Sequence, residues 1–485
     1  MTSAALVAGV EVSPDHHIGG RRVPGDDRFE DRSPIDGEVL AEIARGGKKE
    51  VRLAVEAAEA AFPDWAGLGV AGRAELLRRL ADLIDANVEH VAAVECLDMA
   101  MLERSLRARV IPRGARNYRS YADLAEAYEE RVWSSNGTLN RVLRMPAGPA
   151  AIVTPWNAPF MLSTWKTAPA LAAGCTVVLK PPEWAPLSCS LLADLTEEAG
   201  FSAGVFNVVQ GIGEEAGAAL VAHPGVRRVS FTGSSDTGRL VADSAAQNLV
   251  PFTAELGGKG PFLVFADADL DAAAQKAALQ YDDSGQNCMA GTRLLVEESV
   301  AGEFLQRFHA AVDAHVLGDP REEATTISPL IHPDHLARVD GFVERARANG
   351  DGIVRGGHPS ALGGLWYEPT LVEPRSNDSE IVQREVFGPV LTFQTFATDE
   401  VAVTLANSTE YGLAATVYTG SAERAERVGR ALRAGTVWVN AFLVRDLTAP
   451  FGGIGISGIG REGGNYALDF YSDLKTLQIL EESTR

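Results

Sequence analysis

The chain has 485 residues, of which 46% are hydrophobic and 22% charged, and its formal net charge is −21. A chain of this length exceeds what one compact core supports, so two or three domains are expected. The strong negative charge argues against binding to nucleic acid or to an anionic membrane surface. An anionic ligand would therefore need a local basic site.

The cysteines give no sign of a metal site or a disulfide framework. No pair has CxxC spacing and no histidine cluster accompanies the four residues, which are Cys96, Cys175, Cys189 and Cys288. The first residues lack the basic flank and the apolar run of a signal peptide. No stretch of about 18 apolar residues suggests a membrane span. A reducing cytoplasm is the expected location.

In chain order, residues 1–45 are predicted to form turns and short strands. Apolar residues at helical spacing then predict helices over 51–62 and 76–91. In RVWSSNGTLNRVL, the Asn136-Gly137 pair between two strand-like runs predicts a hairpin over 131–144. So long a polar hairpin has little core to join, and we expect it to reach another subunit.

From residue 150 the chain alternates between apolar runs and helix-like segments. The runs lie at 150–153, 176–179, 205–209 and 228–231, and the helix-like segments at 160–173, 188–199, 214–222 and 237–247. This is the βαβ pattern of a parallel, doubly wound sheet. A second alternating region extends from about residue 262 to 440, so two doubly wound α/β domains are predicted.

Two glycine-rich stretches compete as a dinucleotide loop. GIGISG at 453–458 matches GxGxxG in letters, but no strand precedes it and no helical pattern follows. SFTGSSDTGRL at 230–240 follows a strand-like run and opens a helix-like segment. Its Gly233 and Ser234 would lie at a helix N-terminus, which favours a phosphate. An ordinary helix cap at Ser234 or Ser235 explains the same letters, and spacing alone favours neither reading.

Residues 284–293, SGQNCMAGTR, surround Cys288 with small and polar side chains, unlike the aliphatic surroundings usual for a structural cysteine. Asn157 in TPWNAPF, Lys180 in VLKPPEW and Ser234 are predicted to lie near one crevice at the carboxyl ends of strands. Glu255 in TAELGGKGP lies 33 residues before Cys288. Ligands of open α/β sheets bind at that edge. Each residue alone is more simply structural, but together they supply a nucleophile, a carboxylate and an amide donor.

The order of the motifs resembles that of the NAD(P)-dependent aldehyde dehydrogenase superfamily over nearly the whole chain. The motifs are PWNAPF, KPPEWAPLS, FTGSSDTG, ELGGKGP, GQNCMAGTR, EVFGPV and PFGG followed by SGIGRE. The resemblance implies that Cys288 attacks an aldehyde to give a thiohemiacetal and then a thioester. It implies that the Asn157 amide holds the oxyanion and that Glu255 activates water.

The resemblance also implies NAD as cofactor. Lys180 and Glu183 would hold the adenosine ribose, and an acidic residue there disfavours the 2′-phosphate of NADP. Glu385 would hold the nicotinamide ribose. The remaining residues predicted to bind the cofactor are Trp156, Gly233, Ser234 and Phe387.

The same resemblance divides the chain into three parts. A Rossmann-like cofactor domain would comprise residues 1–130 and 145–253, and a catalytic domain residues 254–445. The hairpin at 131–144 and the tail at 468–485 would form an oligomerisation element, which implies a homodimer or homotetramer. Departures from the family pattern are Asp283 for a frequent Asn, Gly455 for a frequent Lys, and Pro182. We expect only modest effects on loop packing from the first two.

Two further stretches narrow the resemblance to the branch that oxidises hydroxymuconic and carboxymethyl-hydroxymuconic semialdehydes. They are IPRGARNYRSYAD at 111–123 and FLVRDLTAPFGG at 442–453. In that branch the arginines matching Arg113 and Arg445 face the substrate's carboxylate, which suits their planar guanidinium groups. Alternatives left open are a broad-specificity or betaine-aldehyde-type enzyme, a CoA-acylating relative, and a binding protein without turnover.

Overall fold

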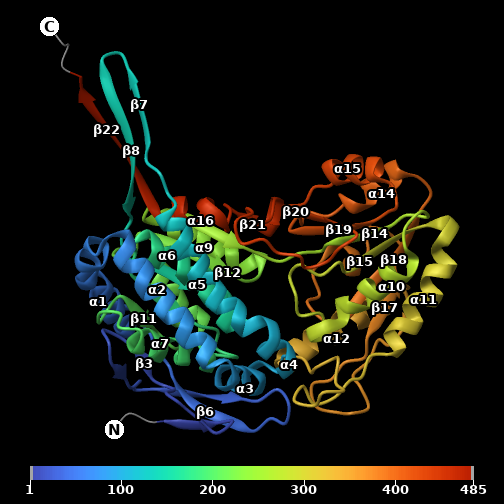
Figure 1. Cartoon of the computed structure of the whole chain (residues 1–485). Coiled ribbons are helices and arrows are strands. Elements are labelled where there is room, and N and C mark those ends of the chain that lie inside the picture. Colours follow the sequence, from blue (N-terminus) through green and yellow to red (C-terminus); the bar gives the residue numbers. More distant parts are fainter. Residues whose placement is uncertain (1–3, 482–485) are drawn as a thin grey trace.

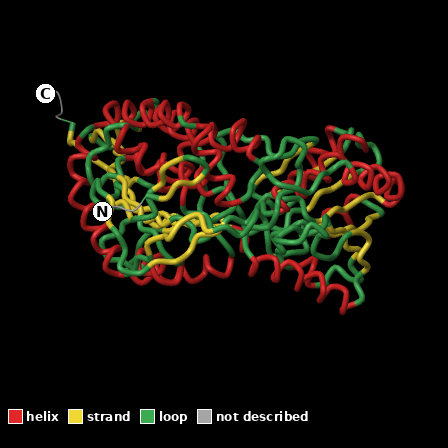
Figure 2. The backbone as a smooth tube through the Cα atoms, turned by 90° about the horizontal axis from the view of Figure 1, so that it is seen from below, coloured by secondary structure: helices red, strands yellow, loops and turns green. Residues whose placement is uncertain are grey.

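The computed structural model describes residues 4–481 and shows two lobes and a projecting arm (Figure 1). Seen from below, strands run through the interior of both lobes and helices lie on the outside (Figure 2). Two small two-stranded sheets lie near the N-terminus, β1 (Ala5–Val7) with β2 (Val10–Val12) and β5 (Arg28–Arg32) with β6 (Val39–Ala44).

The first lobe contains an eight-stranded sheet in the order β21-β13-β12-β9-β10-β11-β3-β4. Its parallel strands are β9 (Ala150–Val153), β10 (Val177–Lys180), β11 (Phe206–Val208), β12 (Arg228–Thr232) and β13 (Phe252–Glu255). Antiparallel strands complete its edges: β3 (His16–His17), β4 (Arg22–Val23) and β21 (Gly458–Ile459).

Two apolar cores cover the two faces of this sheet. The larger core involves α2 (Gly69–Ala86), α3 (Val88–Met99), α5 (Ile111–Glu126), α6 (Pro159–Ala173), α7 (Leu187–Glu198) and α16 (Gly464–Phe470). The opposite core involves α1 (Lys48–Gly67), α8 (Ala218–Val221) and α9 (Ser235–Gln247), with the turn η2 (Gly213–Gly217). Such burial on both faces is what near-continuous apolar strands require.

One helix predicted over 76–91 is divided in the structure. Asn87 separates α2 from α3, and its side-chain amide donates to the carbonyl of Leu83 at 2.9 Å. A side-chain amide that bonds nearby backbone in this way competes with the helical hydrogen bonds. The apolar periodicity continues across the break, which is why it did not reveal the boundary.

The second lobe contains a seven-stranded sheet in the order β16-β17-β18-β15-β14-β19-β20. Its strands are β14 (Pro261–Val264), β15 (Arg293–Glu297), β16 (Gly352–Arg355), β17 (Thr370–Glu373), β18 (Val390–Phe396), β19 (Ala414–Tyr418) and β20 (Thr436–Val439), and only β16 is antiparallel to its neighbour. Its helices are α10 (Leu270–Ala278), α11 (Ala301–Asp313), α12 (Pro333–Asn349), α13 (Glu380–Gln383), α14 (Asp399–Ala406) and α15 (Ala422–Ala431). The predicted mixed α/β class with parallel sheets is confirmed.

The projecting arm is a three-stranded antiparallel sheet, β22-β8-β7 (Figure 1). β7 (Arg131–Ser135) and β8 (Thr138–Pro146) form a hairpin, and β22 (Ser472–Leu480) pairs along the whole of β8. The turn residues Asn136 and Gly137 have φ values of 52° and 68°, as a two-residue hairpin turn requires. Residues 482–485 of the predicted tail lie outside the described residues.

Among residues 4–481, the structure contains no helix that is both long and apolar enough to cross a membrane. All four cysteines are unpaired. Three of them, Cys96, Cys175 and Cys189, are fully packed inside the first lobe, whereas Cys288 is partly exposed.

Candidate active site

The carboxyl ends of adjacent parallel strands bring the predicted site residues to one edge of the first sheet. Lys180 is the last residue of β10 and Glu255 the last residue of β13. Asn157 lies in the turn after β9, and Ser234 lies in the turn after β12. Since β13, β12, β9 and β10 are neighbours in that order, these residues share one edge, where open α/β sheets bind ligands.

The loop that carries Cys288 comes from the second lobe and meets this edge. The Asn157 side-chain amide donates to the carbonyl of Gln286 at 3.0 Å, two residues before the cysteine. The Gln286 side chain in turn accepts from the amide of Ile331 at 3.0 Å. These hydrogen bonds fix the cysteine loop beside the turn that follows β9.

The preceding residues, Asp283 and Ser284, both have left-handed backbone, with φ values of 51° and 54°. Asn and Asp tolerate this region better than most residues, so Asp283 can serve where the family often has Asn. The other departure, Gly455, has φ of 61°, and a Cβ there would lie 2.4 Å from the carbonyl oxygen of Glu410. This backbone would have to move to accept a lysine.

Two glycines of ELGGKGP allow close approach between the two lobes. A Cβ on Gly257 would lie 2.1 Å from Oε2 of Glu385, and one on Gly258 would lie 2.1 Å from the carbonyl oxygen of Cys288. The amide of Gly258 donates to Oε1 of Glu385 at 2.7 Å. The glycines therefore hold Glu385 against the segment that begins at Glu255.

Glu255 is buried, and neither of its carboxylate oxygens has a hydrogen-bond partner among the described residues. Burial, followed by the nearby negative charge of Glu462, raises its pKa well above the ordinary value, although Lys166, Arg445 and Arg461 oppose the shift. An unpartnered, buried carboxyl group with a raised pKa is well suited to take up a proton.

Glu462 and Lys166 are site residues that the sequence analysis missed. Lys166 on α6 donates to Oε1 of Glu462 at 2.5 Å and to Oγ of Ser230 at 3.0 Å, and both charged side chains are buried. Glu462 follows the GIGISG stretch, in SGIGRE, and lies far from Glu255 in sequence. Only the antiparallel pairing of β21 with β13 places this segment beside Glu255.

The pKa of the Cys288 thiol is raised to about 12, first by burial and then by the charges of Glu385 and Glu255. Burial also raises the pKa of Glu385 to about 7. Cys288 in this state is therefore a thiol that needs help to lose its proton. Binding of a substrate does not by itself remove the thiol proton. A neighbouring base is therefore required.

The two residues predicted to hold the adenosine ribose, Lys180 and Glu183, are in contact with each other. Lys180 is buried at the end of β10 and donates to Glu183 at 2.6 Å. Burial alone would raise the pKa of Glu183, but the Lys180 ammonium and several hydrogen bonds hold it below the ordinary value. Two glycines lie close to this pair. A Cβ on Gly213 would lie 3.7 Å from Glu183, and a Cβ on Gly217 would lie 3.9 Å from Lys180.

Ser234 is the N-cap of α9, and its hydroxyl accepts from the amide of Thr237 at 3.1 Å. The ordinary helix cap is thus present, and it leaves the first amides of α9 at the same sheet edge as Lys180. Trp156 lies between the lobes, with ring centroids 5.3 Å from Phe387 and 5.1 Å from His335. Phe387 has a left-handed backbone, with φ of 63°.

Arg113 and Arg445 meet at one aromatic ring although they are far apart in sequence. Their guanidinium carbons lie 5.5 Å and 5.1 Å from the centroid of Trp165. Arg113 donates to Asn117 at 3.0 Å, and Arg445 also lies 3.8 Å from the ring of Phe451. Among the described residues neither arginine forms an ion pair with a carboxylate, so two half-buried positive charges remain available.

Burial, followed by the charges of Arg445 and Arg116, lowers the pKa of Arg113 to about 10. Burial lowers the pKa of Arg445, while Glu255 and Glu462 oppose that shift. The interaction with Glu255 places Arg445 close to the predicted reaction centre. Both guanidinium groups would gain from an anion placed between them.

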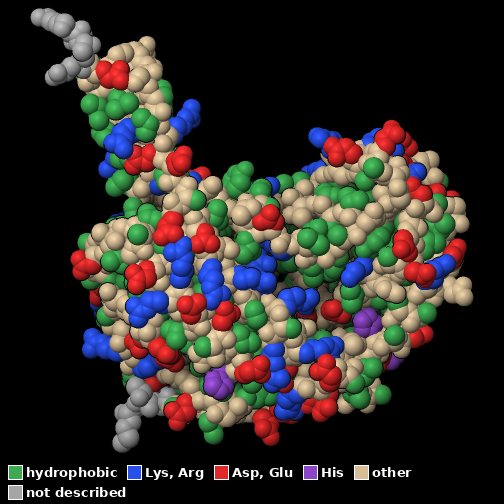
Figure 3. Space-filling view, viewed as in Figure 1, with side chains coloured by type: hydrophobic (Ala, Val, Ile, Leu, Met, Phe, Trp, Pro, Cys, Tyr) green, Lys and Arg blue, Asp and Glu red, His purple; other side chains and the backbone are tan. Residues whose placement is uncertain are grey.

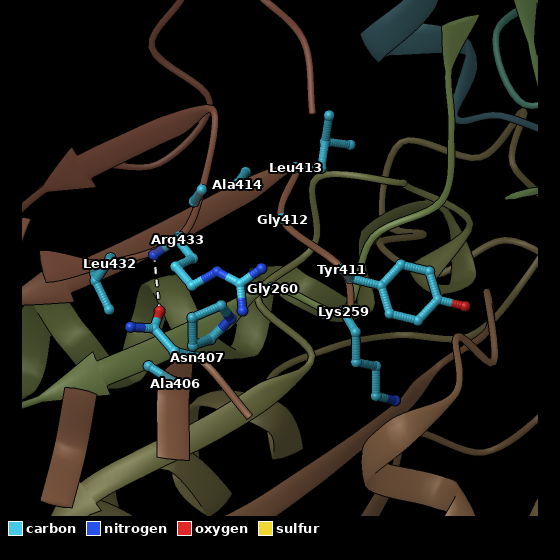
Figure 4. A pocket seen from close by; sticks show the side chains of 13 residues that line it. Lys259, Gly260, Ala406, Asn407, Tyr411, Gly412, Leu413, Ala414, Leu432 and Arg433 are labelled. Carbon is cyan, nitrogen blue, oxygen red and sulfur yellow. Dashed lines mark hydrogen bonds between the residues drawn. The ribbon is translucent and has the colours of Figure 1, made fainter. Parts of the chain in front are cut away.

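A separate cavity of about 10 Å³ lies behind the glycine segment and is lined by Lys259, Tyr411 and Asn407 (Figure 4). It is about large enough for one water molecule. On its far side Asn407 accepts from the amide of Arg433 at 2.7 Å, and Figure 4 shows the Lys259 side chain directed away from that bond. This cavity is too small for an aldehyde substrate.

This arrangement of a partly exposed cysteine, a buried carboxyl group and an amide donor at a sheet edge matches a known family. The model of the aldehyde dehydrogenase family matches residues 23–477, and the chain belongs to this family. It is 42% identical over 463 residues to the 2-hydroxymuconic semialdehyde dehydrogenase of Pseudomonas sp. (strain CF600), covering 93% of this chain and 95% of that protein.

It is 40% identical to the 5-carboxymethyl-2-hydroxymuconate semialdehyde dehydrogenase of Escherichia coli, covering 93% and 98% of the two chains. Among solved structures, the indole-3-acetaldehyde dehydrogenase of P. syringae in complex with NAD+ superposes with a TM-score of 0.95. It is 38% identical, and 97% of each chain is covered. The family predicted from the sequence is confirmed, and the chain is similar to members of the predicted semialdehyde branch.

The raised pKa of Cys288 gives the first prediction. The rate of alkylation of this thiol should increase with pH well into the alkaline range, because only the thiolate reacts. In Glu385→Gln a negative charge that disfavours the thiolate is lost, so the midpoint should fall by roughly one pH unit. Iodoacetamide labelling followed by mass spectrometry measures both midpoints. Glu373→Gln, an exposed carboxylate on β17, is the matched control, and an unmoved midpoint in Glu385→Gln would contradict the assignment.

Proposed function

We propose that the chain is a hydrolytic, NAD-dependent dehydrogenase that oxidises a carboxylate-bearing semialdehyde to the acid. The observation that carries the proposal is the pair of half-buried arginines, Arg113 and Arg445, which meet at Trp165. Of the two, Arg445 interacts with Glu255 and Cys288. The similarity to two muconic-type semialdehyde dehydrogenases supports the same substrate class.

Cys288 is the proposed nucleophile. The thiol proton passes to one of the two carboxylates that act on it, Glu385 or Glu255. The thiolate sulfur then attacks the aldehyde carbon, and the carbonyl oxygen becomes an oxyanion. One N–H of the Asn157 amide already holds the carbonyl of Gln286, so its second N–H is available to the oxyanion. Preorganised donors of this kind lower the barrier by about 3–4 kcal/mol each.

Glu255 is the proposed base for hydrolysis. It takes a proton from water, the hydroxide attacks the thioester carbon, and the acid leaves with release of the Cys288 thiolate. The buried Glu462 opposite Glu255 raises its affinity for that proton. Glu255 also argues against the CoA-acylating alternative, which has no need of a base for water.

The residues present fit NAD, which when bound supplies the acceptor for the hydride lost from the substrate carbon. Glu183 is ionised by its contact with Lys180 and retains partial exposure, so it can accept from a ribose hydroxyl. Gly213 and Gly217 leave room for close approach, and the α9 N-terminus suits the phosphates. Glu385 is the proposed ligand of the second ribose, with Trp156 and Phe387 beside it.

The two free arginines also bear on the remaining alternatives. Two positive charges would repel the quaternary ammonium of a betaine aldehyde. A binding protein without turnover would have no need of an unpartnered buried carboxyl group next to an accessible thiol. A carboxylate gains a charge-assisted hydrogen bond from either guanidinium group.

The arm supports a homodimer or homotetramer. Its exposed apolar side chains include Val132, Trp133, Leu474 and Leu477, which are 39–63% exposed. A three-stranded sheet that projects from the body with such side chains is typical of a surface covered by another subunit. The four unpaired cysteines agree with the reducing cytoplasm expected for this enzyme.

The role of Glu255 is tested by Glu255→Gln. The variant should release NADH in a burst of about one per active site and then turn over slowly, because the thioester forms but water is not activated. Rapid-mixing absorbance measures the burst. Cys288→Ala should give no burst while still binding NAD, and a Glu255→Gln enzyme without a burst would rule out this role.

The carboxylate site is tested with 6-oxohexanoate and hexanal, which match in length and differ in charge. Arg113→Ala or Arg445→Ala should each lower kcat/KM for the acid about 10- to 100-fold, the equivalent of about 1.5–3 kcal/mol for a charged hydrogen bond. The loss for hexanal should be much smaller. Equal losses for both aldehydes would leave a general aldehyde dehydrogenase without a carboxylate site.

Cofactor preference is tested by kcat/KM with NAD and NADP. The wild type should prefer NAD, because the Glu183 carboxylate repels a 2′-phosphate. Glu183→Gln should reduce the preference by at least about tenfold, which corresponds to about 1.4 kcal/mol. Glu214→Gln, which changes an exposed glutamate next to Gly213, is the control. A wild type that uses NADP equally well would overturn the assignment.

A further inference from the structure

The segment Glu103–Arg119 carries six arginines, and the structure divides them into two sets. Three are held by the protein. Arg107 pairs with Glu103 and Glu89 at 2.5 Å and 2.8 Å, and Arg119 pairs with Asp82 and Asp85 at 2.6 Å each. Arg104 donates to the carbonyl of Glu323 at 2.6 Å.

The other three, Arg109, Arg113 and Arg116, form no ion pair with a carboxylate in the part of the chain that the structure describes. Arg109 and Arg116 are exposed and Arg113 is half-buried. They follow one another at spacings of four and three residues, so they lie on one face of the helical segment formed by η1 (Leu106–Val110) and α5.

This face points toward the reaction centre. Arg109 lies close enough to Asp282 and Asp283, at the start of the cysteine loop, to lower the pKa of both carboxyl groups against the larger effect of burial. Arg116 lies close enough to Arg113 to lower its pKa. The N-terminal end of α5, next to α4 (Glu103–Ser105), reaches the boundary between the lobes beside α12 (Figure 1).

A band of Lys and Arg side chains crosses this view of the molecule over α2 and α5, toward the hollow between the lobes (Figure 3). The chain as a whole carries a net charge of −21. An anionic substrate is therefore repelled by most of the surface at long range. A local row of positive charge reverses that field near the entrance and increases the rate of encounter.

We propose that Arg109 and Arg116 extend the Arg113–Arg445 site outward as a steering row that draws anionic aldehydes into the cleft between the lobes. The proposal rests on the proposed anionic substrate. It assigns to Arg109 and Arg116 a role in capture and selectivity, separate from the contact that Arg113 and Arg445 make with the bound carboxylate.

The two carboxylates near Arg109 do not cancel the row. Burial raises the pKa of Asp282 to about 7 and also raises that of Asp283, so both hold a proton more readily than a surface aspartate does. The charges of Arg107 and Arg119 are neutralised by their carboxylate partners, although Arg119 follows Arg116 by three residues on the same side of the segment.

The experiment measures kcat/KM for 6-oxohexanoate and hexanal at ionic strengths from about 10 to 300 mM, a range that shortens the Debye length from about 30 Å to well under 10 Å. For the wild type, kcat/KM with the acid should fall as salt increases, and with hexanal it should stay nearly level. The double variant Arg109→Gln/Arg116→Gln should lose about 3- to 10-fold with the acid at low salt. Its salt dependence should be flatter, and kcat should change less than kcat/KM.

The control is Arg107→Gln/Glu103→Gln, which removes a paired arginine of the same helical segment together with a carboxylate partner and leaves the net charge unchanged. It should retain the wild-type salt dependence. If the Arg109/Arg116 variant also retains it while Arg113→Ala still discriminates against the acid, the steering row is wrong and the carboxylate site stands. If Arg113→Ala and Arg445→Ala fail to discriminate, both proposals are overturned.

Discussion

The hydrogen bond from the Asn157 amide to the Gln286 carbonyl is the contact on which the geometry of the site depends. It joins the turn after β9 in the first lobe to the cysteine loop of the second. The glycines at 257 and 258 add to this contact, because only residues without a Cβ allow Glu385 and the Cys288 backbone to approach so closely.

Electrostatics at this junction depend on burial. Glu255, Glu385 and Cys288 all have raised pKa values, with burial as the largest cause. Because each of the three groups resists ionisation, it is costly for more than one of them to be negatively charged at the same time. A thiolate at Cys288 therefore favours the protonated form of the carboxyl groups around it. The positive charges of Lys166 and Arg445 lie on the Glu255 side, where they make a carboxylate less costly. The site therefore resembles a coupled set in which a proton lost by one group is readily taken by another.

Much of this was predictable from sequence because it is local. The alternation from residue 150 predicted β9, β10, β11 and β12 nearly to the residue, although it did not include β13, and Asn136-Gly137 predicted the hairpin turn. Lys180, Asn157 and Ser234 were predicted to share one sheet edge because they end or follow strands, whereas Glu255 was singled out by the resemblance. Glu462 and Lys166 were not found, since their relevance arises from the pairing of β21 with β13 and from the packing of α6. Neither the strand pairing nor the helix packing can be predicted from a local periodicity in the sequence. The break at Asn87 was missed for the opposite reason, because the apolar pattern runs across it.

Sequence and structure give different information about which arginines can bind an anionic substrate. Motif resemblance singled out Arg113 and Arg445, but it gave no physical reason why Arg113 should differ from the other arginines of its helical segment. The structure makes that distinction through partners: Arg107 and Arg119 are neutralised by carboxylates, whereas Arg113 and Arg445 stack on Trp165 and remain uncompensated. Half-buried guanidinium groups without a counter-ion are costly to the free protein. A bound carboxylate would offset that cost, so the proposed selectivity for an anionic aldehyde rests on charges that the fold leaves unpaired.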